Sequence, residues 1–193
     1  DDIESDTGVL TGHVYSQLYL NNYLEDNITV FEFNLKFTPH SENSNKNMSL
    51  LSLRRTEDGY SGSYNEPILY LAPNGNLIYE SVVLCDANGE PMQISKDNWT
   101  NVAVIYDSVA GQISFRIDGK IPYYNSDNEL LLAQQIQLPT PRYYKMTSPD
   151  TRAVIFSADV TKSGKEITDR FLGTLDVSYV KVYNIDESAT SGF

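Results

Sequence analysis

The sequence predicts an all-β protein in which two antiparallel sheets pack as a sandwich. Apolar and polar residues alternate with a period of two in several segments of the 193-residue chain, and no sustained helical periodicity is present. Turn residues and long polar connections separate these segments. An α/β fold would need helices alternating with the strands, so the sandwich is the better prediction.

The clearest strand in the first third of the chain is "ITVFEFNLKF". Its apolar side chains fall on one face and its polar side chains on the other, as in a half-buried strand: Phe31, Phe33, Leu35 and Phe37 against Glu32, Asn34 and Lys36. "MSLLSL" and residues 68–84 predict further strands. The second of these is interrupted by Asn74-Gly75-Asn76, which favours a tight hairpin because these residues tolerate a positive φ.

The segment that begins at the only tryptophan, Trp99, is predicted to be part of the structural scaffold and not of a ligand-binding surface. "VAVIY" is apolar on both faces, as in a central strand, and "ISFRI" alternates. Asp118-Gly119 then favours a reversal. A two-residue turn places Ile117 opposite Lys120, whereas a three-residue loop with a bulge places it opposite Ile121 and is preferred because it matches the apolar faces. We expect Trp99 to be a core anchor.

Two later segments leave alternatives open. Residues 128–138, "NELLLAQQIQL", could form a short helix or another strand. In the closing segment "LGTLDVSYVKVYN", residues 172–184, the apolar parity changes around Tyr179-Val180. This change indicates either a bulge or a strand that is covered on both faces.

These motifs carry a resemblance to a known family. Trp99 followed by "VAVIYD", then "ISFRIDGK" and the closing "FLGTLDVSYVKVYN", resembles the laminin-G-like branch of the concanavalin A-like lectin and glucanase superfamily. The resemblance implies a jelly-roll sandwich with one concave sheet, in which the concave face or its rim loops hold ligands. Members include lectins, carbohydrate-binding modules, adhesion domains and glucanases, so the fold alone does not select a function.

Composition bounds the remaining possibilities. With 26 acidic and 14 basic residues, the net charge is −12, so nucleic acid is not expected as a partner. No apolar run reaches the roughly 20 residues of a membrane helix, so membrane insertion is not expected either. We predict one domain over residues 1–193, with short flexible termini at about 1–8 and 186–193. The single cysteine, Cys85, is predicted to act as a small, buried, apolar residue.

We expect no catalytic activity from the chain itself. Glucanases of the superfamily carry an "E-x-D-x-x-E"-like strand, because two carboxyl groups about 5 Å apart must act together. No interior strand has this pattern, and "DDIESD" lies at the terminus. No cofactor is required. Calcium is possible because lectins of the superfamily use it, with Asp26, Asp107, Asp118 and Asp176 as candidate ligands, but no ligand spacing supports a particular site.

Glycan recognition needs aromatic faces for stacking and polar side chains for hydroxyls or carboxylates. The tyrosines that lie within strand patterns are predicted to pack in the core or against the sheet: Tyr70, Tyr79, Tyr106, Tyr179 and Tyr183. Three polar clusters predict ligand contact instead, because binding residues concentrate on loops. They are Arg54, Arg55, Tyr60, Tyr64 and Asn65; Tyr123 and Tyr124, with Asn125 and Asp127; and Arg142, Tyr143 and Tyr144. The first cluster alternatively pairs its arginines with Glu57 and Asp58, whereas in a binding role an arginine could hold an acidic sugar. In each tyrosine pair, one ring is expected to pack inward.

The predicted function is therefore a non-catalytic carbohydrate-binding or adhesion module of a larger extracellular, cell-surface or virion protein. Its expected partners are a glycan, with acidic sugars among the candidates, and the flanking domains of a larger protein. A glycosidase or a sialidase is one candidate for that parent protein. The first alternative is a structural or protein-interaction sandwich of a fibre or appendage, with an oligomer possible. The second alternative is a glycan-cleaving enzyme of the glucanase branch.

Overall fold

The described part of the chain is made of strands joined by turns and loops. The computed structural model describes residues 3–4, 10–11, 16–19, 28–39, 47–56, 63–107, 110–137, 152–158 and 173–185. Fifteen strands and no helix occur within these ranges. The described residues therefore include no helix that could cross a membrane.

One of the two main sheets has five antiparallel strands in the order β13-β10-β9-β4-β15. They are β4 (Ile28–Pro39), β9 (Thr100–Asp107), β10 (Gln112–Ile117), β13 (Ile136–Gln137) and β15 (Gly173–Ile185). The predicted central strand, "VAVIY", lies within β9 and is indeed central. Its inward residues Val102 and Val104 are buried in the core, and the outward Ala103 is also buried.

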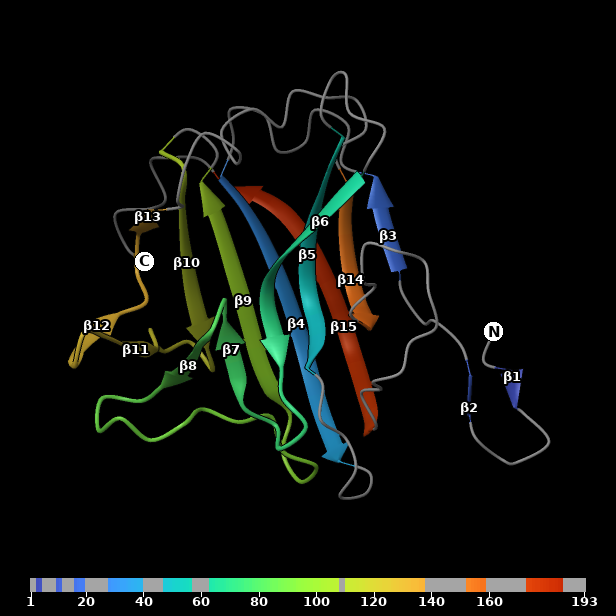
Figure 1. Ribbon diagram of the computed structural model, residues 1–193, viewed down its shortest axis with the longest axis horizontal. Coiled ribbons are helices and arrows are strands. Elements are labelled where there is room, and N and C mark those ends of the chain that lie inside the picture. Colours follow the sequence, from blue (N-terminus) through green and yellow to red (C-terminus); the bar gives the residue numbers. More distant parts are fainter. Residues whose placement is uncertain are drawn as a thin grey trace.

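The other main sheet has eight strands in the order β12-β11-β8-β7-β6-β5-β14-β3. They are β3 (Ser16–Tyr19), β5 (Met48–Thr56), β6 (Ser63–Leu71), β7 (Leu77–Tyr79), β8 (Val82–Cys85), β11 (Tyr123–Ser126), β12 (Glu129–Leu132) and β14 (Arg152–Ala158). Strands β1 (Ile3–Glu4) and β2 (Leu10–Thr11) form a separate pair. In Figure 1, β5, β6 and β7 overlie strands of the five-stranded sheet. The predicted all-β antiparallel sandwich is confirmed.

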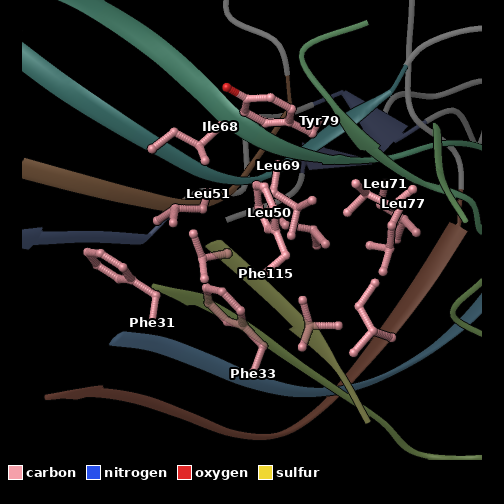
Figure 2. Close-up of a cluster of buried hydrophobic side chains, with 14 of the residues drawn as sticks. Phe31, Phe33, Leu50, Leu51, Ile68, Leu69, Leu71, Leu77, Tyr79 and Phe115 are labelled. Carbon is pink, nitrogen blue, oxygen red and sulfur yellow. The ribbon is translucent and has the colours of Figure 1, made fainter. Parts of the chain in front are cut away.

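The core lies between these two sheets. The predicted alternation in β4 is confirmed, because Phe31, Phe33, Leu35 and Phe37 are all buried in it. Figure 2 shows Phe31, Phe33 and Phe115 on the side of the five-stranded sheet and Leu50, Leu51, Leu69 and Leu77 among the residues across from them. Cys85 is buried as predicted, and its thiol donates to the carbonyl of Tyr123 at 3.3 Å.

Two turn predictions have different outcomes. The hairpin at Asn74-Gly75 is confirmed: it joins β6 to β7, and Gly75 has a φ of 90°. The three-residue loop that would place Ile117 opposite Ile121 is wrong. The backbone N–H of Ile117 donates to the carbonyl of Lys120 at 2.9 Å, which closes a two-residue turn. Asp118 and Gly119 both have positive φ, as a type I′ turn requires.

The physical reason for this outcome is that the chain changes sheets after the turn. Strand β11 pairs with β8 of the other sheet and not with β10, so apolar faces need not match across the turn. Of the two alternatives left open for the closing strand, the structure has the bulge, because the register against β4 shifts between Val177 and Tyr179. Residues 128–138, left open between helix and strand, contain β12 and β13.

Candidate functional site

The candidate site lies on the face of the five-stranded sheet that points away from the core, called the outer face below. Alternation places it opposite the buried phenylalanines of β4. Its side chains come from outward positions of the four longer strands: Glu32, Asn34 and Lys36 of β4; Asn101, Ala103, Ile105 and Asp107 of β9; Gln112, Ser114 and Arg116 of β10; and Asp176, Tyr179, Lys181 and Tyr183 of β15. Cross-strand pairing therefore brings residues more than 140 positions apart into one surface.

The centre of the outer face is a hydrogen-bonded polar network around one carboxylate. Tyr179 Oη donates to Oε1 of Glu32 at 2.7 Å, and Asn101 Nδ2 donates to the same oxygen at 2.9 Å. Tyr183 Oη donates to Oε2 at 3.1 Å. Asn101 Nδ2 also donates to Tyr179 Oη at 2.8 Å. Three strands thus fix the carboxylate, which makes the network a preorganised polar surface.

The network also fixes the protonation states of its members. Burial alone would raise the pKa of Glu32, but hydrogen bonds from Tyr179, Asn101 and Tyr183, together with the charge of Lys181, lower it below its ordinary value. The hydrogen bond to Glu32 raises the pKa of Tyr179. Burial, followed by the charge of Glu32, raises the pKa of Tyr183. At neutral pH, an ionised acceptor is therefore held by two neutral phenol donors.

Trp99 lies at one end of this face, and the prediction that it anchors the core is wrong. Its side chain is 46% exposed. The ammonium of Lys36 lies 5.1 Å from the ring centroid and donates to the carbonyl of Asp97 at 3.2 Å. The reason is parity: Thr100 and Val102 are the inward-facing buried residues at the start of β9, so Trp99 belongs with the outward set.

Tyr183 also departs from its prediction. The structure confirms packing for Tyr79 and Tyr106, which are 5% and 0% exposed, whereas Tyr183 is 38% exposed. Tyr179 is half-buried beneath the ammonium of Lys181, which lies 4.3 Å from its ring centroid. Exposed aromatic rings and cations therefore lie on the same face as the Glu32 network.

A small open pocket of about 90 Å³ lies on the outer face beside this network. Its polar lining includes Gln112, Ser114 and Arg116 from β10 and Gln134 and Gln135 from the segment before β13. We refer to it as the Arg116 pocket. Arg116 is only 9% exposed, and its Nη1 donates to the carbonyl of Phe115 at 3.0 Å.

A backbone irregularity shapes the wall of this pocket. Phe115 N–H donates to the carbonyl of Ala133 at 3.1 Å, and Ile113 pairs with Ile136. Residues 134 and 135 together therefore oppose Ser114 alone, as in a bulge. Gln135 has a φ of 54°, and its N–H donates to Ser114 Oγ at 2.9 Å. A non-glycine residue held in this region marks a locally constrained segment.

The residues predicted to bind ligand lie elsewhere. Arg54 and Arg55 are in β5, and their backbone partners in β6 are Asn65 and Tyr64. The pairing brings these four positions together, but in a ladder instead of the expected loop. The side chains of these four residues are outside the described part of the structure, as are Tyr60, Arg142, Tyr143 and Tyr144.

The second predicted cluster lies mostly in a strand: Tyr123, Tyr124 and Asn125 belong to β11, and Asp127 lies in the turn that follows it. Tyr123 and Tyr124 form the start of β11, where they pair with Cys85 and Leu84 of β8. Both rings are half-buried, and Tyr124 packs against the core, as predicted for one ring of the pair. These tyrosines are in the eight-stranded sheet, so the structure does not unite them with the Glu32 network.

The remaining predictions concern metal ions and the two ends of the chain. The Asp118 carboxylate accepts the backbone N–H of Asn101 at 2.8 Å, a turn role, and Asp26 lies outside the described residues. No group of three or more His, Cys, Asp or Glu side chains that could hold a metal ion occurs within the described ranges. The predicted flexible termini fall outside those ranges too, except for the residues of β1.

Sequence reasoning missed the outer face, although one signal was present. Polar residues at the outward positions of β4, notably Glu32 and Lys36, indicate a solvent-facing surface. An arginine between the apolar residues of "ISFRI" is a second such signal. Nothing in the sequence alone, however, specifies that β15 adds its tyrosines to the same surface, because that pairing joins distant segments.

No family model and no curated protein sequence matches the chain. Several solved structures resemble its fold. An alginate lyase from Pseudomonas aeruginosa is 11% identical, with a TM-score of 0.45 and coverage of 83% of this chain and 66% of the lyase. The CBM40 domain of the Ruminococcus gnavus IT-sialidase, bound to α2,3-sialyllactose, is 16% identical, with a TM-score of 0.43 and coverage of 84% and 80%. A carbohydrate esterase from the Shiga toxin-encoding bacteriophage phi24B is 12% identical, with a TM-score of 0.44 and coverage of 89% and 75%.

This likeness is one of general fold. The similar structures are jelly-roll folds of the concanavalin A-like type, the type that the sequence resembles. The chain spans 66% of the length of the Pseudomonas lyase. The expectation that the chain is not an enzyme is contradicted by this set, because lyases, an esterase and a sialidase occur in it.

Proposed function

We propose that the outer face of the five-stranded sheet binds a glycan. The observation that carries the proposal is the placement of two exposed aromatic rings, Trp99 and Tyr183, on the same face as the Glu32 hydrogen-bonded network. Aromatic rings offer apolar faces to the C–H surface of a sugar, and fixed polar groups bond its hydroxyls. The face supplies both kinds of contact.

The electrostatics of the outer face differ from those of the whole chain. The chain has a net charge of −12, but on this face Lys36, Lys181 and Arg116 balance the carboxylates of Glu32, Asp107 and Asp176. Local cations offset the repulsion that the acidic protein would otherwise exert on an anionic glycan. The proposed ligands therefore include acidic as well as neutral oligosaccharides.

The setting that we propose is extracellular, on a cell surface or on a virion, where the domain would act beside other domains of a larger protein. An acidic chain with one buried cysteine suits such a setting because it needs no reducing environment. We also propose calcium as a candidate cofactor of this binding, so the affinity for the glycan is to be measured both with added calcium and with a chelator.

The test is titration calorimetry against a panel of acidic and neutral oligosaccharides. We expect the wild type to bind at least one of them and Trp99→Ala to lower that affinity about tenfold or more. Leu132→Ala is a matched control, because Leu132 is also 46% exposed but belongs to β12 of the other sheet. Its affinity should equal that of the wild type.

The same incubations are to be followed for product release, which separates binding from turnover. Binding to the panel without any loss in Trp99→Ala would place the glycan site elsewhere on the chain. If no saccharide binds with or without calcium, the proposed function is wrong.

A further inference from the structure

We propose that the Arg116 pocket is a carboxylate subsite of the glycan-binding face, so the preferred ligand is an acidic oligosaccharide. This inference rests on the proposed function and adds to it a substrate class and a residue that selects it. It differs from the sequence-based expectation, which assigned acidic sugars to Arg54 and Arg55.

The first argument is the burial of a cation that has no carboxylate partner among the described residues. A guanidinium has five N–H donors. Within the described residues, Arg116 makes one hydrogen bond, to a backbone carbonyl of its own strand, and no ion pair with a carboxylate. Burying a charge is costly unless it is paired, so this side chain is poised for an incoming anion. Its burial also lowers its pKa, and no described carboxylate opposes that shift.

The second argument is the shape and lining of the pocket. The site opens on the outer face, where Gln112, Gln134 and Gln135 add amide groups beside the guanidinium. Ile105 adds an apolar wall. Asp107 also lines the pocket and accepts the backbone N–H of Ala110 at 2.8 Å. The lining therefore combines one buried cation and three glutamines with the Asp107 carboxylate, which is held by the Ala110 N–H. In this setting the guanidinium can bind a carboxylate that is attached to a hydroxyl-rich ring.

The third argument is position. Arg116 pairs with Ala103, and Ala103 pairs with Glu32, so one cross-strand row joins the pocket to the polar network. Two strand spacings separate the two side chains, a distance of about 10 Å. A short oligosaccharide can therefore reach both, with its carboxylate at Arg116 and another sugar unit beside the Glu32 network.

The test compares acidic sugars with their neutral counterparts. The probes are an alginate tetrasaccharide against the same tetrasaccharide with reduced carboxyl groups, and α2,3-sialyllactose against α2,3-sialyllactose with its carboxyl group reduced. In at least one pair we expect the wild type to prefer the acid by about tenfold to a hundredfold at low ionic strength, the usual scale of a charge-assisted pair. Arg116→Gln should abolish this preference, so that the affinity for the acidic member of the pair falls to about that for the neutral member.

Two variants control for the loss of charge. Lys120→Gln removes one positive charge from the exposed turn after β10, so it should keep the preference. Arg116→Lys keeps the charge without the bidentate fork and should retain only part of the preference. A readout on the wild type guards against misfolded variants: the Arg116 Nε–Hε resonance should shift with the acidic sugar and not with the neutral one.

The outcomes separate the two proposals. Equal affinity for the acidic and neutral members of both pairs, or an unchanged preference in folded Arg116→Gln, would overturn the carboxylate subsite and leave glycan binding intact. A wild type that binds no member of either pair or of the wider panel would overturn both.

Discussion

Replacing Trp99 with alanine tests whether this residue belongs to a binding surface or to the core. Truncating a fully buried large aromatic side chain costs about 3–5 kcal/mol of unfolding free energy. Because Trp99 is 46% exposed, we expect roughly half of that, about 2 kcal/mol. Loss of the cation–π contact with Lys36 accounts for about 0.5–1 kcal/mol of it.

Phe33→Ala is the reference for a core truncation. Phe33 is 0% exposed and packs edge-on against Phe156, with ring centroids 5.7 Å apart. Its truncation should cost about 3–5 kcal/mol, because it leaves a cavity between the sheets. Trp99→Ala should therefore destabilise the protein less than Phe33→Ala and yet weaken glycan binding more.

Urea unfolding followed by circular dichroism measures the two free energies, and calorimetry on the folded variants measures the two affinities. A loss of stability in Trp99→Ala as large as that in Phe33→Ala would refute the exposed position of the tryptophan. A small loss of stability with unchanged glycan affinity would retain that position but refute its binding role.

Three further outcomes follow from the described contacts. The folded-state pKa of Glu32 is depressed, so the stabilisation that its network provides is fully present above the ordinary pKa of 4.5 and is lost as the pH falls through the lower folded-state value. Glu32→Gln should remove this part of the dependence of Tm on pH. A Tm–pH profile equal to that of the wild type would contradict this reasoning. Burial and then the charge of Asp86 raise the pKa of Cys85, so iodoacetamide at neutral pH should modify the thiol only after unfolding, and rapid labelling of the native protein would argue against its burial. Gly75→Ala should lower the unfolding free energy by more than about 1 kcal/mol, because the φ of residue 75 is positive and a Cβ there would lie 2.6 Å from the carbonyl oxygen of Ile94. Equal Tm values for the variant and the wild type would show that the hairpin can adjust.

The sequence predicted the elements whose pattern is local. Alternation in β4 and the apolar faces of β9 gave the right strands, because a side chain that must be buried every second residue leaves a visible period. Asn74-Gly75 gave the right hairpin for a similar reason, since a positive φ restricts which residues can occupy the turn.

The site could not be predicted in the same way. The Glu32 network depends on Tyr179 and Tyr183, which reach it only through the pairing of β15 with β4. The position of Trp99 was misjudged because a lone tryptophan next to a strand gives no parity until the strand's first residue is known. The predicted ligand clusters were chosen as loops, whereas Arg54 and Tyr123 lie in strands.

The bulge in β15 makes one strand obey two different alternations. Before it, Leu175 packs against the core and Asp176 faces outward; after it, Val180 packs inward and Tyr179 faces outward, and Ser178 is the residue without a partner in the ladder. Deleting Ser178 would leave Val177 opposite Leu35 and Tyr179 opposite Asn34, so both segments would keep their faces in one regular alternation. Deleting a paired residue of the strand instead would turn the side chains on one side of the deletion to the opposite face, so that either Leu175 enters water or the tyrosines of the network turn into the core. The strand therefore tolerates the loss of its bulge residue but not the loss of a paired one.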